Sequence, residues 1–137
     1  MKEKSRFMAQ DFKQRIDLGI TQDGLISFGV FTGLRRTLDN HVTGLGFDSD
    51  VFRAGVFADK LNEAFNRLDG KSNAVEELIA PFYRRRIRIL PHADVVTITV
   101  PFRGEEEQTV TIGKQDLKQL IEKLRDLIAR IKDEEDN

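Results

Sequence analysis

The segment from Arg85 to Ile112 constrains the fold most, because its apolar residues recur at every second position. Turn-forming residues at 90–94 and 103–106 divide it into three alternating runs. A period of two sends successive side chains to opposite faces of a sheet, so one face is apolar and the other polar. The pattern predicts a three-stranded antiparallel β-meander over 84–112. Its expected apolar face comprises Ile87, Ile89, Val96, Ile98, Val100, Phe102, Val110 and Ile112.

The residues after this meander predict a long amphipathic helix over 114–132, with Gly113 as its N-cap. Its apolar side chains occupy the a, d and e positions of a heptad. A stripe this wide can cover the apolar face of the chain's own sheet or pack against a second copy of the chain. The acidic residues at 133–136 place negative charge at the negative end of the helix, so we expect this end to fray. The stripe consists of Leu117, Leu120, Ile121, Leu124, Leu127, Ile128 and Ile131.

The first part of the chain predicts helices. Met8, Phe12 and Ile16 recur at intervals of four, which favours a helix over 6–18. The apolar residues of 25–38 fit either a helical stripe or a buried strand, and we favour the helix although glycines weaken it. A glycine-containing loop is expected to follow over 40–47.

Two further helices are expected before the meander. Aspartates up to Asp50 can cap the first of them, and a capping-box spacing favours a shorter one that reaches Ile79. We detect no internal repeat. The elements predict one α+β domain over 1–137, with a helical half over 1–80, the β-meander over 84–112 and the C-terminal helix over 114–132.

Strand alternation places a row of arginines on the polar face of the expected meander. Arg84, Arg86 and Arg88 would be separated by about 6.6–7 Å, close to the spacing of phosphates along an extended single strand. Guanidinium groups and hydroxyls both donate to phosphate oxygens, so this face predicts nucleic-acid binding. The candidate binding residues are Tyr83, Arg84, Arg86, Arg88, Thr97, Thr99, Thr109 and Thr111.

Two other interpretations of this face remain open. The arginines could pair with the acids at 105–107 and form an ordinary solvated face, since surface ion pairs are common. They could instead contact an acidic protein surface. No aromatic residue alternates onto the face, so the stacking platforms typical of single-strand binders are missing there, and only Phe82 and Tyr83 flank it.

Scarce residue types exclude several kinds of chemistry. The chain has no Cys and two His, which excludes disulfides, thiolate nucleophiles and zinc sites that need Cys or several His. A formal net charge of −1 argues against coating nucleic acid by bulk charge. We see neither a membrane-spanning apolar run nor a signal peptide, and we expect a soluble cytoplasmic protein that does not contact membranes.

One loop carries residues suited to metal or acid–base chemistry, namely Asp39, His41, Asp48 and Asp50. Turn and helix-capping roles explain these residues more simply. We therefore expect a protein that is not an enzyme, with no catalytic residues, no metal and no cofactor.

Two functions are expected from these features. The first is a non-enzymatic binding or assembly module that acts as a homo-oligomer through the apolar stripe at 117–131. The alternative is a protein that binds single-stranded or structured nucleic acid through the arginine row.

Overall fold

A computed structural model describes residues 3–8, 14–32, 44–68, 76–82, 85–101 and 107–135, and all structural statements below concern these ranges. Their elements follow the order of four strands, a helix, four strands and a second helix. The first four strands form one antiparallel sheet in sequence order. They are β1 (Glu3–Met8), β2 (Gln14–Ile20), β3 (Ile26–Thr32) and β4 (Gly44–Ser49), and α1 (Val51–Asn66) follows them.

The second half of the chain repeats this arrangement. Four strands again form an antiparallel sheet in sequence order, and a helix again follows the last strand. These elements are β5 (Leu78–Phe82), β6 (Arg85–His92), β7 (Val95–Pro101), β8 (Glu107–Gly113) and α2 (Lys114–Glu135).

The two helices carry their buried residues at the same spacing. Leu61 of α1 and Leu124 of α2 are identical equivalents, but most other equivalent pairs differ in size. The buried positions of α1 and of the residues just after it are Ala54, Phe57, Ala58, Leu61, Ala64 and Leu68, and those of α2 at the same spacing are Leu117, Leu120, Ile121, Leu124, Leu127 and Ile131. The described residues thus form a tandem of two ββββα units, a structural repeat that was not predicted from the sequence.

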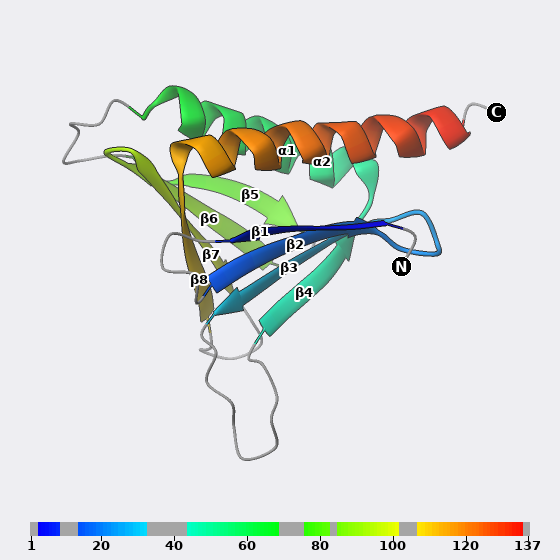
Figure 1. Cartoon of the computed structure of the whole chain (residues 1–137), viewed down its shortest axis with the longest axis horizontal. Coiled ribbons are helices and arrows are strands. Elements are labelled where there is room, and N and C mark those ends of the chain that lie inside the picture. Colours follow the sequence, from blue (N-terminus) through cyan, green and yellow to red (C-terminus); the bar gives the residue numbers. More distant parts are fainter. Residues whose placement is uncertain are drawn as a thin grey trace, which may run out of the picture.

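Each helix packs across the boundary between the units. α1 lies against β5 and β6 of the second sheet, and α2 contacts β1 and β2 of the first sheet. The helices also lie side by side over the sheets (Figure 1). An ion pair between Arg125 Nη2 and Asp59 Oδ1, 3.1 Å apart, joins their exposed surfaces. Neither unit therefore has a complete core of its own.

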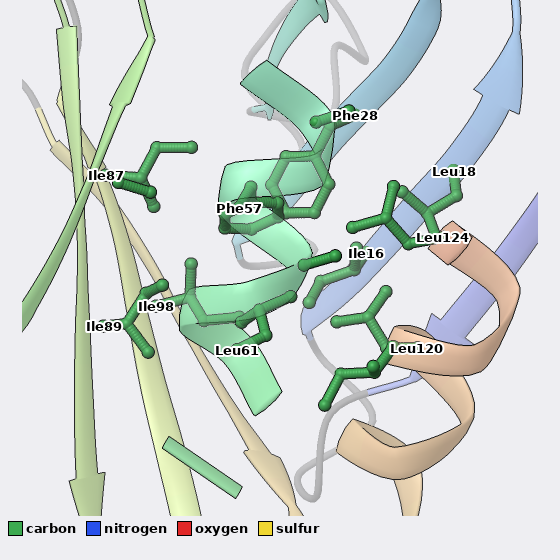
Figure 2. Packing of buried hydrophobic residues seen from close by; sticks show 14 of the residues in the cluster. Ile16, Leu18, Phe28, Phe57, Leu61, Ile87, Ile89, Ile98, Leu120 and Leu124 are labelled. Atoms are coloured by element: carbon green, nitrogen blue, oxygen red, sulfur yellow. The ribbon is translucent and has the colours of Figure 1, made fainter. Parts of the chain in front are cut away.

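One core joins both sheets and both helices. Its sheet residues come from alternate positions, such as Ile16 and Leu18 on β2 and Ile87 and Ile89 on β6, all fully buried. Figure 2 shows α1 at the centre of this core, between the second sheet on one side and the first sheet and α2 on the other. There the ring of Phe57 meets the ring of Phe28 edge to face, with centroids 5.0 Å apart.

The helices predicted before residue 44 are wrong wherever the structure describes this part of the chain. The segment expected as a helix over 6–18 overlaps the end of β1 and most of β2. The segment 25–38 includes the strand β3, and a strand was the alternative prediction there. The strand β4 occupies part of the expected loop at 40–47. The reason is visible in β2, where buried Ile16 and Leu18 alternate with Arg15 and Asp17. This period of two outweighs the intervals of four that suggested a helix.

The second sheet has one strand more than predicted. Leu78 and Ile79, expected at the end of a short helix, belong instead to β5, which pairs with β6 at the sheet edge. Pro81 is compatible with this position, because an edge strand leaves backbone donors unpaired on its outer side. The apolar face of β6–β8 is buried as expected, except that Phe102 lies outside the described residues. The antiparallel α+β class is confirmed, whereas N-terminal helices are not observed in the described ranges.

The helices predicted after Asp50 and after Gly113 are confirmed as α1 and α2. Asp50 caps α1, since its Oδ1 accepts from the backbone N–H of Arg53 at 2.8 Å. α2 begins at Lys114 as expected but continues to Glu135, so the acidic end predicted to fray is helical as far as that residue. Buried Ile131 anchors this last part of the helix. Neither helix of the described ranges has the length and apolar character to span a membrane.

Candidate functional site

The face of the second sheet that points away from the helices carries most of the predicted binding residues. We call it the Arg–Thr face. Its outward positions alternate with the buried ones along β5 to β8, so that Arg86 is exposed next to buried Ile87 on β6. The Arg–Thr face comprises Ile79, Arg86, Arg88, Leu90, Thr97, Thr99, Thr109 and Thr111.

Strand register arranges these residues in rows across the sheet. One row runs from Ile79 through Arg88 and Thr99 to Thr109. The next row on the same face begins at Leu90 and continues through Thr97 and Thr111. The structure thus brings together the predicted Arg86, Arg88 and four threonines, whereas Tyr83 and Arg84 lie outside the described residues.

The threonines interact in cross-strand pairs. The Oγ1 atoms of Thr97 and Thr111 are 3.1 Å apart, and those of Thr99 and Thr109 are 3.2 Å apart. Each pair joins β7 to β8, which orients the hydroxyl groups on the sheet surface. The face therefore presents an ordered polar surface rather than a set of independent side chains.

Arg88 is held by acidic neighbours. Its Nη2 donates to both carboxylate oxygens of Glu107, each 2.8 Å away, and its Nη1 lies 3.9 Å from Glu77 Oε2. The pairing with an acid at 105–107 that the solvated-face interpretation predicts is thus observed for Arg88. Arg86 is exposed, and no ion pair within the described part of the chain includes it.

Two exposed aliphatic side chains lie beside Arg88 and were not predicted as site residues. Ile79 is opposite Arg88 on β5 and is 42% exposed, and Leu90 is two residues further along β6 and is 37% exposed. Ile79 lies between buried Leu78 and Ala80, so strand alternation indicates its outward position. The prediction of a helix for this segment gave no reason to place Ile79 on the sheet face. Leu90 was assigned to a turn, although it continues the alternation of β6.

The same face of the first sheet has a different chemistry. Its positions equivalent to Arg88 and Thr99 are Asp17 and Gly29, which pair across β2 and β3. Asp17 is 7% exposed, and its Oδ2 lies 3.6 Å from Arg15 Nε. The combination of two arginines with paired hydroxyls therefore belongs to the second sheet.

The other two predicted regions give little support to a site. The apolar stripe proposed as an oligomer interface is buried within a single chain, with Leu117 and Leu120 fully covered. Asp50 caps α1 and Asp48 is exposed on β4, while Asp39 and His41 lie outside the described residues. No group of three or more His, Asp or Glu side chains suited to a metal occurs in the ranges that the structure describes.

In comparisons with known proteins, no protein-family model and no curated protein sequence matches the chain. Any function must therefore be argued from the chemistry of the Arg–Thr face itself.

Proposed function

We propose that the protein binds nucleic acid through the Arg–Thr face. The observation that carries this proposal is the pair of solvent-accessible arginines on one strand, beside ordered hydroxyls and away from both helices. Arg86 and Arg88 are two residues apart on β6, so their Cα atoms are separated by about 6.6–7 Å, which is close to the spacing of nucleotides along an extended strand. The net charge of −1 is an average over the whole chain and does not describe this face.

Binding of labelled oligonucleotides tests this proposal. Fluorescence anisotropy with oligonucleotides of about 20 nucleotides, both DNA and RNA, is expected to give dissociation constants of about 10⁻⁶ M or lower in dilute salt, weakening steeply as salt is added. The variant Arg86→Ala/Arg88→Ala is expected to bind at least about tenfold more weakly, because it loses the charged donors of the face. Circular dichroism should show that both proteins remain folded, since both side chains are solvent-accessible.

The matched control is Arg125→Ala/Arg130→Ala, which removes two exposed, ion-paired arginines from α2. It changes net charge equally and is expected to bind as the unmodified protein does. Equal loss in both variants would show that binding follows overall charge. Absence of binding by the unmodified protein in dilute salt would refute the proposal.

Self-association is a second candidate function, now resting on different residues from those predicted. Phe52, in the first turn of α1, is 76% exposed. Val56, one turn later, is partly exposed. The space beside Gly55 is open, since a Cβ atom added there would have no neighbour within 4 Å. We call the side chains of Phe52 and Val56, one turn apart on α1, the Phe52–Val56 patch; exposed aromatic residues of this kind are enriched at contact surfaces.

Sedimentation equilibrium at micromolar to millimolar concentration tests self-association. If the patch joins two copies, Phe52→Ser is expected to raise the dissociation constant of the dimer about tenfold or more, because a buried aromatic anchor contributes strongly to an interface. A monomer over this whole concentration range would exclude the second candidate.

A further inference from the structure

Arg88 adopts a conformation suited to more than phosphate contact. It projects from β6 and reaches Glu107 on β8, with β7 lying between them. Two strand spacings correspond to about 9.5 Å, so the side chains of Arg88 and Glu107 together bridge β7 along the sheet surface. Thr99, directly opposite Arg88 on β7, is correspondingly only 9% exposed. The guanidinium is thus held over the sheet while its side chain stays 40% exposed.

The acidic partners change what Arg88 can do. Glu107 and Glu77 already offset its charge, so it is a weaker phosphate ligand than Arg86. A guanidinium also has a flat surface, on which aromatic rings stack. Nucleic-acid bases stack on arginine planes in the same way as on aromatic side chains. Arg88 therefore offers a platform that the face otherwise lacks among its described residues.

The aliphatic neighbours extend this platform. Ile79 lies across the strand pair from Arg88, and Leu90 lies about 6.6–7 Å along β6. Both are exposed although they are apolar, and contact with the faces of bases would remove their surface from water. In a duplex these base faces are already stacked, whereas in a single strand they are accessible.

We infer that the Arg–Thr face takes single-stranded nucleic acid, with bases lying on Arg88, Ile79 and Leu90 and a phosphate on Arg86. This inference rests on the proposed function and specifies its ligand. The shared ligand chemistry is an unpaired base next to a phosphodiester, which single-stranded DNA and RNA both provide.

Four probes of equal length test the inference by fluorescence anisotropy: oligodeoxythymidine, oligouridine, a DNA duplex, and a strand of abasic sugar-phosphate. We expect at least one of the two base-carrying single strands to bind about tenfold or more tightly than the abasic strand and the duplex. Equal affinity for the abasic strand would overturn the inference and leave nucleic-acid binding through phosphate contacts intact. Failure to bind every probe would instead refute the proposed function itself.

Two arginine variants separate stacking from charge. Arg88→Lys keeps the charge but loses the flat guanidinium, and is expected to bind the preferred single strand about tenfold more weakly with an unchanged salt dependence. Arg86→Lys is the matched control and should bind nearly as the unmodified protein does. Arg86→Ala should reduce the slope of log K against log salt by about 0.7, the value for one phosphate contact to a single strand. Unchanged affinity of Arg88→Lys for the single strand would overturn the inference.

Discussion

Replacing Phe57 by alanine is expected to lower the free energy of unfolding by about 3–5 kcal/mol, the range for a large aromatic side chain removed from a core. Phe57 is 1% exposed and contacts the ring of Phe28 on β3. It lies where α1, both sheets and α2 meet, so the surrounding elements are fixed and a cavity would collapse poorly (Figure 2). Urea denaturation followed by circular dichroism measures the change.

The same helix offers a control for this loss. Phe52→Ala makes the same chemical change at a position that is 76% exposed, and it should alter the free energy of unfolding by no more than about 0.5 kcal/mol. Should Phe57→Ala prove too unstable to purify, Phe57→Leu should give a smaller, measurable loss of about 1–2 kcal/mol. Comparable effects at Phe52 and Phe57 would contradict the described core.

Separating the two ββββα units is expected to unfold both of them. A fragment of residues 1–70 retains α1 but lacks β5 and β6, against which α1 packs. A fragment of residues 71–137 retains α2 but lacks β1 and β2. Each fragment would leave part of its apolar sheet face and part of its apolar helix stripe in water, and the burial of such surfaces is the main favourable term in folding.

Circular dichroism and size-exclusion chromatography of dilute fragments measure this effect. Each fragment alone should give the spectrum of an unfolded chain, and an equimolar mixture should regain β-sheet and helix signals in one complex. A pair of fragments divided inside β6 serves as the control. Because this division interrupts an inner strand of the second sheet, mixing these two fragments should not restore the β-sheet and helix signals. Cooperative unfolding of either ββββα fragment as a monomer would show that the units are independent.

The sequence predicts the fold best where one signal acts alone. From Arg85 to Ile112 the period of two is uninterrupted within each strand, and the apolar face derived from it is buried wherever it is described. In α2 the wide stripe likewise identified a buried helix. Over 6–38 a few apolar residues fit helix and strand patterns equally well, although β2 and β3 are as long as β7 and β8. Tertiary pairing of β1 to β4 decides between them, and pairing is not a local property.

The repeat is hard to detect in the sequence because the two helices share the spacing of their buried positions but neither the size nor the identity of most side chains there. Ala54 and Leu117 occupy equivalent buried places, as do Ala64 and Leu127, yet neither pair shares a residue type. The site shows a similar division. Alternation identified Arg86, Arg88 and the threonines as one face, whereas the ion pair of Arg88 with Glu107 depends on the register of three strands.

The packing of each helix against both units also bears on the order in which the chain is made. When α1 has been synthesised, the strands β5 and β6 that it contacts have not yet been made. The helix α2, which contacts β1 and β2 of the first sheet, is made last. At ordinary rates of translation this interval is on the order of ten seconds. During that time the apolar faces of the first unit depend on ribosome-associated chaperones or transient collapse for protection. A slow-translating stretch between the units would lengthen this exposure and favour aggregation of the nascent chain.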